Sequence, residues 1–502
     1  MAMTLGFGLI RTKLTKFQPR FVRNFSTSNY LLKKKDDDYV EVQPPERIHP
    51  MERVKNIVKN DFKQMFDPEA PPLDDFSTHV DIAIIGGGVM GSAIAYFLKE
   101  RIPRAGLKVL VIEKDPSYSK SSTVLSAGGV RTQFSLKENV EMSLFGAEFL
   151  RNAPKHLAVE DSPGPDMHFH PQGYLYIASE AGAEQLHKNQ ILQTSLGAKV
   201  ELLSPTKLKE RFPWINTDDI ALATHGIQHE GWFDPWSLLY GFKRKAMALD
   251  VEYVQAEVVG FEFRSRTDLT ISTLEEGEPY EGIDKILIKT TKGELKTVKF
   301  AFAIVAAGHE SGKIAEMARI GRGEQLLSVP LPVEPRKRYV YHYHAPDKDG
   351  PGLNCPMVID HTGAYFRREG LANYFICGQS PPNDEEPETE TLDVDYSFFD
   401  NVLWPNIANR CPAFNNVKIK SAWAGYYDYN YFDQNAIIGG HPFYYNLYFA
   451  CGFSGHGIQQ APAVGRAIAE MILDGEFRNI DLSRFAWDRL IVGRKVVEKN
   501  IL

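Results

Sequence analysis

A glycine-rich run supplies the first residues whose type and spacing could do chemistry. Residues 86–91 read Gly-Gly-Gly-Val-Met-Gly and match GxGxxG, with an apolar run before them and a helical pattern after them. In this pattern Gly86 permits a tight turn, Gly88 lets the backbone approach a pyrophosphate, and Gly91 allows a helix to pack closely on a strand. The run therefore predicts a site for an adenine dinucleotide.

An acidic residue completes this predicted nucleotide site. Glu113 ends the next apolar run, close to the spacing of about 20 residues at which a carboxylate accepts hydrogen bonds from ribose hydroxyls. A carboxylate at this position disfavours a 2′-phosphate, which argues against NADP and leaves FAD and NAD. The other nucleotide contacts that we predict beside the motif are Val89, Met90 and Lys114.

Three further segments could contact FAD, which is long and needs contacts beyond the first turn. One run offers hydroxyls and small residues, a second ends an apolar strand, and a third opens the last long helix, whose N-terminus could stabilise negative charge. The contacts predicted from these segments and from the neighbouring sheet are Ser121, Ser122, Ser126, Val258, Ala307, Gly308, Gly452, Gly455 and Gln459.

Three side chains are candidates for the reaction itself. His456 is flanked by glycines and could approach a cofactor, although a structural or capping histidine fits the pattern equally well. Lys337 could stabilise negative charge on a reduced flavin, or belong to a solvated basic strand end; strand alternation places it opposite its two neighbouring arginines. Arg367 could bind a carboxylate bidentately, or form a surface ion pair with Glu369 or Glu334.

The elements that must position these residues fall into two patterns. Apolar strands at 80–85 and 107–113 flank a helix at 92–99 and predict a β-α-β unit in a parallel sheet. Polar and apolar residues alternate over 168–177 and 335–378, which predicts an antiparallel sheet. Other predicted elements are a helix at 236–249 with Asp234 as its N-cap and Pro235 at its first position, a solvated acidic loop at 384–395, a strand at 446–450 and a helix at 461–473.

Composition excludes several classes of protein. The chain has 502 residues, 43% of them hydrophobic and 24% charged, so it is globular and long enough for more than one domain. Its formal net charge of −7 gives no support for binding nucleic acid. The 4 cysteines lack metal-ligand spacing, so we expect reduced thiols and no metal site.

The N-terminus carries a different signal. No acidic residue precedes Asp36, and basic residues recur among apolar ones, which is typical of a mitochondrial transit peptide; a disordered basic tail is the alternative. We predict a transit peptide over 1–32 and an arm with a short helix near 51–65 over 33–78. No sustained apolar run is long enough for a transmembrane helix, so any association with the inner membrane is expected to be peripheral.

Several motifs together resemble the D-amino-acid oxidase and sarcosine oxidase family, also called the glycine oxidase family. The resemblance covers roughly residues 79 to 480 and is carried by IIGGGVMG, VIEKD, SSTVLSAGGV, VAAGHES and GFSGHGIQQAP. It implies an FAD domain, an antiparallel substrate-domain sheet that covers the flavin, and a carboxylate-binding segment at Arg367. Its similarity to a mitochondrial member through GWFDPWSLL and LPVEPRKRYVY also implies a part in respiratory complex I assembly, with complex I subunits or assembly intermediates as partners.

Departures from the family pattern concern the cofactor and the substrate. Leu125 stands where dimethylglycine dehydrogenases carry the histidine that bonds FAD, and residues 422–427 lack the cysteine that sarcosine oxidases use. We therefore expect noncovalent FAD. Gln459 stands where those oxidases carry a lysine that helps to bind the substrate carboxylate, so part of the usual pocket differs.

The sequence thus predicts α/β plus antiparallel β, a Rossmann-type FAD-binding domain interleaved with a substrate domain. The FAD-binding parts are 79–165, 231–325 and 421–502, and the substrate parts are 166–230 and 326–420. We expect a mitochondrial matrix flavoprotein that oxidises a small amine or N-alkyl amino acid. The alternative is an assembly factor that FAD stabilises, with little or no turnover.

Overall fold

The computed structural model describes residues 31–33, 39–41, 76–103, 106–159, 163–266 and 280–499. The chain divides into two compact units, Met1–Pro72 and Leu73–Leu502. In the first unit the described elements are β1 (Leu31–Lys33) and β2 (Tyr39–Glu41), which pair antiparallel. The basic segment up to residue 30 and the helix predicted near 51–65 lie outside the described residues.

The second unit contains two eight-stranded sheets, and the first holds the predicted β-α-β unit. Its strand order is β12-β11-β10-β4-β3-β13-β20-β19. The strands from β10 to β20 in this order run parallel, and β11, β12 and β19 are antiparallel to their neighbours. The bounds are β3 (Ile82–Ile85), β4 (Val109–Glu113), β10 (Glu252–Arg266), β11 (Tyr280–Thr290), β12 (Leu295–Lys299), β13 (Phe302–Val305), β19 (Ile437–Gly440) and β20 (Leu447–Cys451).

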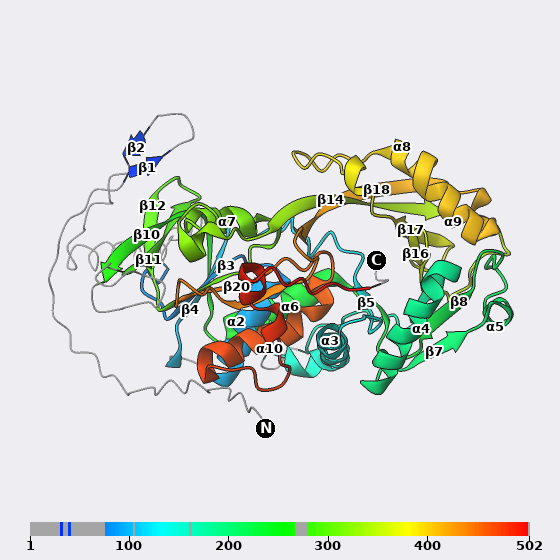
Figure 1. Cartoon of the computed structure of the whole chain (residues 1–502), viewed down its shortest axis with the longest axis horizontal. Coiled ribbons are helices and arrows are strands. Elements are labelled where there is room, and N and C mark those ends of the chain that lie inside the picture. The colour runs from blue at the N-terminus through cyan, green and yellow to red at the C-terminus, as the bar shows by residue number, and fades with distance from the viewer. Residues whose placement is uncertain are drawn as a thin grey trace, which may run out of the picture. The chain divides into compact units, whose positions relative to one another are not determined.

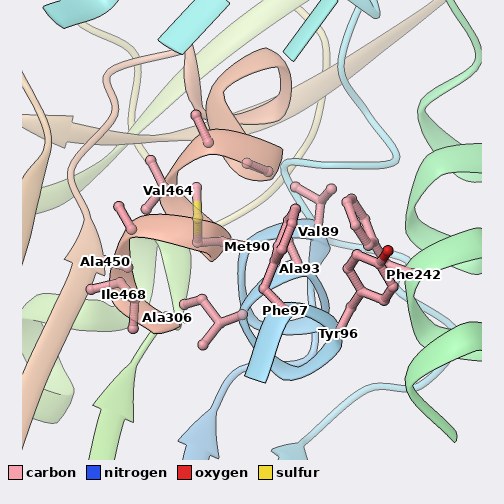
Figure 2. Packing of buried hydrophobic residues seen from close by; sticks show 14 of the residues in the cluster. Val89, Met90, Ala93, Tyr96, Phe97, Phe242, Ala306, Ala450, Val464 and Ile468 are labelled. Carbon is pink, nitrogen blue, oxygen red and sulfur yellow. The ribbon is translucent and has the colours of Figure 1, made fainter. Parts of the chain in front are cut away.

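Helices cover one face of this sheet with an apolar core. They are α2 (Val89–Arg101), α3 (Lys137–His156), α6 (Pro235–Ala248) and α10 (Gly457–Asp474), which lie together beside the parallel strands (Figure 1). Figure 2 shows Tyr96 of α2 beside Phe242 of α6, with ring centroids 5.5 Å apart. A Cβ on Gly465 would lie 2.8 Å from the carbonyl carbon of Ala93, so α10 packs against the backbone of α2. The opposite face packs with α7 (Ser311–Met317) and a second apolar core.

The second sheet has the order β18-β14-β17-β16-β15-β6-β8-β7. Its pairs are antiparallel except β15 with β6. The bounds are β6 (Tyr174–Ala178), β7 (Val200–Leu203), β8 (Leu222–Gly226), β14 (Val333–His344), β15 (Met357–Ile359), β16 (Tyr365–Arg368), β17 (Tyr374–Gly378) and β18 (Lys418–Asn430). The helices α4 (Glu180–Ser195), α5 (Pro205–Arg211), α8 (Tyr396–Phe398) and α9 (Trp404–Arg410) lie near this sheet, and β5 (Gly129–Val130) pairs with β9 (Gly231–Trp232) (Figure 1).

The predicted fold class is confirmed, because strands of the two sheets alternate along the chain. One boundary needs correction. The return to the FAD-binding part at residue 421 would divide β18, which pairs with β14 as far as Asn430. The chain re-enters the first sheet only at β19.

The predicted starts of α6 and α10 can be compared with the structure. Asp234 accepts hydrogen bonds from the amides of Trp236 and Ser237, so the start of α6 was predicted correctly. The start of α10 was predicted wrongly, because the helix begins at Gly457 and carries Pro462 inside it rather than near its first position. Within the described part of the chain, the structure has no helix with the length and apolar character needed to cross a bilayer.

Candidate cofactor and active site

A cavity of about 1260 Å³ joins the two sheets. Its walls include Gly86 and Ala306, which directly follow the parallel strands β3 and β13, and Met357 and Tyr174 of the second sheet. Ligands of open parallel sheets bind at the carboxyl ends of the strands, as here. The volume exceeds the roughly 300 to 1,000 Å³ of pockets for drug-sized ligands, so it suits a dinucleotide with a second molecule.

The glycine-rich run forms a narrow turn at one end of this cavity. Gly86 has φ +101°, and a Cβ there would lie 2.4 Å from the carbonyl oxygen of Ala306. A Cβ on Gly91 would lie 1.9 Å from the carbonyl oxygen of Gly86, so the start of α2 presses on the turn. A Cβ on Gly88 would meet only the hydroxyls of Thr123 and Ser121, at 3.5 and 3.9 Å. The side of Gly88 is thus open for the approach of a phosphate.

Glu113 lies beside this turn at the end of β4. Its Oε2 accepts a hydrogen bond from the amide of Gly87 at 2.7 Å, and its Oε1 accepts one from the amide of Asp115 at 2.8 Å. Burial raises the pKa of Glu113, although the two backbone hydrogen bonds oppose this shift. Each carboxylate oxygen keeps a lone pair, so the side chain can still accept hydrogen bonds from ribose hydroxyls.

Most of the predicted cofactor residues line the same cavity. They are Gly86, Gly88, Val89, Met90, Glu113, Lys114, Ser121, Ser122, Ser126, Val258, Ala307, Gly308, Gly455 and Gln459. Gly91 and Gly452 do not line it, and each acts through the backbone instead. Gly452 has φ +75° and donates a hydrogen bond to Oδ2 of Asp428 at 2.8 Å. The open side of Gly88, with the hydroxyls of Thr123 and Ser121 around it, forms a cradle that fits the pyrophosphate of FAD.

Lys114 is held at the wall of the cavity by an ion pair with Glu310.

Asp428, also in the wall, was not predicted from the sequence. Its Oδ2 accepts hydrogen bonds from the amides of Gly452 and Phe453, directly after β20, at 2.8 and 3.0 Å. Desolvation raises the pKa of Asp428 to about 6. This carboxyl therefore joins β18 of the second sheet to the turn that follows β20.

Arg131 is a cation in the wall that sequence reasoning missed. Its Nη2 lies 2.9 Å from Nε2 of His456, and its backbone amide donates to Oε1 of Gln459 at 2.7 Å. Its Cζ lies 5.0 Å from the ring centroid of Phe134 and 6.0 Å from that of Tyr174. A buried guanidinium between aromatic rings can bind a carboxylate bidentately. Its place directly after the run SAGGV was the available signal.

Arg367 does not line the cavity. Its Nη2 and Nε donate to the carbonyl of Ala127 at 3.0 and 3.3 Å, and its Nη1 pairs with Glu369. Its Cζ lies 5.2 Å from the ring centroid of Trp232. The predicted alternative, an ion pair with Glu369, is present, but the arginine is buried at 8% exposure rather than superficial. Arg367 therefore stabilises the turn around Ala127 from the side that faces away from the cavity.

Lys337 also faces away from the cavity. Its side chain is buried, and Nζ donates to the carbonyl of Thr391 at 3.1 Å. The neighbouring Arg338 lines the cavity instead, as strand alternation requires for residues on opposite faces. His456 does line the cavity, where its ring meets Phe134 edge-on with centroids 5.2 Å apart.

The family model described as "FAD dependent oxidoreductase" matches residues 81–471. The chain therefore belongs to this family, and FAD is its cofactor. It is 45% identical over 488 residues to FAD-dependent oxidoreductase domain-containing protein 1 of Xenopus laevis, covering 96% of this chain and 95% of that protein.

More distant relatives match most of the chain. Monomeric sarcosine oxidase of Bacillus sp. (strain NS-129) is 24% identical, over 84% of this chain and 100% of that protein. L-proline dehydrogenase from P. horikoshii is 26% identical, with a TM-score of 0.68 over 84% of this chain and 100% of that one. Glycine oxidase from Geobacillus kaustophilus has the same fold, with 21% identity and a TM-score of 0.63 over 81% of this chain and 98% of that one.

Proposed function

We propose that the protein oxidises the C–N bond of an N-alkyl amino acid, or of a similar small amine, with FAD. The observation that carries this proposal is the cavity that includes both the cradle at Gly88 and the buried cation Arg131. Relatives named sarcosine oxidase and glycine oxidase support the same reaction class. Their names describe amino acids whose carboxylate a guanidinium can bind.

We assign the binding roles to residues of the cavity wall. Gly88 and the first turn of α2 take the pyrophosphate, and Glu113 takes the ribose hydroxyls. FAD, when bound, supplies the hydride acceptor. Arg131 binds the substrate carboxylate, and the ring of Tyr174 beside it excludes water. Arg131 takes the role that the sequence assigned to Arg367.

We also propose that FAD is held without a covalent bond. Leu125 lies in the cavity wall, where a Cβ on Gly425 would approach its Cβ to 3.0 Å. An alkyl side chain there cannot bond to FAD, and residues 422–427 contain no cysteine. Acid precipitation of the yellow protein should therefore release all of its flavin.

The cellular role is a second proposal, and it rests on the presequence and the family resemblance. We propose that the protein lies in the mitochondrial matrix and takes part in the assembly of respiratory complex I, with assembly intermediates as partners. In the scaffold form of this proposal FAD stabilises the fold by binding, without turnover. Rescue of complex I by a variant that binds FAD but cannot oxidise amines would support the scaffold.

One experiment tests the oxidase proposal directly. The purified holoprotein is mixed anaerobically with a panel of N-methyl amino acids while flavin absorbance is followed. We expect at least one compound to bleach the flavin in wild type, and a slower or weaker reaction in R131K. A flavin that no member of the panel reduces would contradict the oxidase and favour the scaffold.

A further inference from the structure

A second arginine lines the cavity, and a neighbouring loop holds its charged end. Arg338 of β14 is 11% exposed, and its Nη1 and Nη2 donate to the two carboxylate oxygens of Glu386 at 2.7 and 2.8 Å. Its Nε is buried and has no hydrogen-bond partner in the described part of the chain. The paired contacts have the geometry with which an arginine binds a carboxylate ligand.

Glu386 comes from a segment that forms part of the cavity wall. This segment, residues 379–395, connects β17 with α8, and Ser380, Pro381, Asn383, Thr389 and Glu390 line the cavity. Tyr426 donates its hydroxyl to the carbonyl of Thr389 at 2.8 Å, and Gln379 accepts a hydrogen bond from the side-chain amide of Asn406 at 3.0 Å, so the segment is anchored on both sides of Glu386. Glu386 can therefore shift without release of the whole segment.

The ion pairs of Glu386 are unequal. Its Oε1 also lies 3.0 Å from Nη1 of Arg336, but Arg336 has a second acid, Glu334, at 2.8 Å. Among the described residues, Glu386 is the acidic side chain paired with Arg338. If Glu386 moved away, Arg336 would stay neutralised and Arg338 would be left as a buried charge that needs another anion.

Arg338 and Arg131 each lie beside an aromatic ring of the cavity wall. The Cζ of Arg338 lies 5.5 Å from the ring centroid of Tyr427, and the Cζ of Arg131 lies 6.0 Å from that of Tyr174. Both rings line the cavity, as does that of Tyr365. The wall thus carries a cation beside each of two of its aromatic side chains.

We propose that Arg338 is a specificity-determining residue that binds a second carboxylate of the substrate, and that Glu386 holds this position until the substrate replaces it. The substrate class is then an N-alkyl amino acid with an acidic side chain, with one carboxylate on Arg131 and the other on Arg338. This inference rests on the proposed oxidase function. A substrate with one carboxylate would leave Glu386 in place.

The direction in which E386Q changes the dissociation constant of N-methylaspartate distinguishes this role from a purely structural ion pair. E386Q frees Arg338 from its competing carboxylate, so we expect the dissociation constant of N-methylaspartate to fall about tenfold, since a charged hydrogen bond contributes at least that factor. The constant for N-methylalanine should change less than twofold. E388Q is the matched control, because Glu388 is an exposed acid of the same segment, and it should change neither constant. If E386Q leaves the ratio of the two constants unchanged, the proposal is wrong.

Variants of Arg338 should change the dissociation constant of N-methylaspartate in the opposite direction. R338Q should raise the dissociation constant of N-methylaspartate at least tenfold with little effect on N-methylalanine, whereas R338K should retain part of the preference. Flavin content and melting temperature are recorded for each variant, so that loss of fold is recognised. An unchanged preference in correctly folded R338Q would overturn the role of Arg338.

The same measurements distinguish failure of this inference from failure of the proposed function. Flavin that is reduced by N-methylalanine, but no better by N-methylaspartate, would contradict the second-carboxylate site and leave the oxidase standing. If neither compound reduces the flavin, the oxidase proposal fails, and a titration of flavin absorbance with succinate and propionate decides the inference. Tighter binding of succinate, lost in R338Q, would support the site; equal binding would overturn it.

Discussion

The backbone amide of Arg131 donates a hydrogen bond to Oε1 of Gln459 at 2.7 Å, which joins the segment after β5 to the first turn of α10. The adjacent Gln460 donates to Oδ1 of Asn139 in α3 at 3.0 Å. Both glutamines are buried. The side chain that stands where sarcosine oxidases carry a substrate-binding lysine is thus used to hold the backbone of the cavity's arginine.

This contact gives a first prediction. Q459A would leave the buried amide of Arg131 without its acceptor, which costs about 1 to 3 kcal/mol. We expect a lower free energy of unfolding and a weaker affinity for carboxylate ligands, measured by urea unfolding and by titration of flavin absorbance. Q190A, at a partly buried position on α4, is the control and should leave the affinity for carboxylate ligands unchanged. Unchanged ligand affinity in Q459A would show that Arg131 is positioned by other contacts.

A second prediction concerns the glycine cradle. G88D should abolish retention of FAD, because its carboxylate would repel the pyrophosphate, whereas G88A should weaken retention less, because its Cβ adds bulk without charge on the side that is open to the phosphate. The readout is the ratio of flavin to protein after gel filtration. Full flavin content in G88D would show that the pyrophosphate binds elsewhere.

A third prediction follows from Asp428. The pKa of its carboxyl is about 6 in the folded protein and 3.8 ordinarily, so the folded protein binds this proton more tightly than the unfolded chain. Its stabilising contribution is present below about pH 4 and is lost as the pH rises through 6. D428N should therefore gain about 1 to 3 kcal/mol relative to wild type between pH 4 and 7, measured by unfolding at each pH. A difference that does not change with pH would contradict the raised pKa.

The sequence predicted best where chemistry is local. Gly88 and Glu113 belong to a spacing that one β-α-β unit imposes, and Asp234 caps α6 through amides two and three residues away. The start of α10 was predicted wrongly because proline is usual at the first helical position, whereas α10 begins at Gly457 and carries Pro462 in its interior.

The errors arose where two distant segments neutralise each other. The acidic residues 384–395 were interpreted as a solvated loop, and a solvated strand end was one of the two interpretations of the basic run 336–338. In the structure Glu386 pairs with Arg336 and Arg338. A single sequence does not show such pairing between distant segments. Arg131 was missed for a related reason, since Tyr174 beside it comes from β6 of the second sheet, more than 40 residues along the chain.

A fourth prediction concerns import. Deletion of residues 2–25 removes the basic segment that precedes the first acidic residue, and the shortened protein should stay in the cytosol. Fractionation with protease protection measures this, and a variant with the same deletion fused to an unrelated presequence should be imported. Protease-protected import of the deletion variant by itself would refute the transit peptide.

The last prediction compares two buried arginines that keep their charge when replaced by lysine. R131K loses the fork that we assign to the substrate carboxylate, so anaerobic flavin reduction by N-methyl amino acids should slow at least tenfold while the melting temperature stays close to that of wild type. R367K loses the paired hydrogen bonds to Ala127 and the contact with Trp232, so its melting temperature and flavin content should fall. The fraction of R367K that retains flavin should react at the wild-type rate, because Arg367 does not line the cavity. The reverse outcome, a stable but slow R367K beside a fast R131K, would return the carboxylate anchor to the position that the sequence predicted.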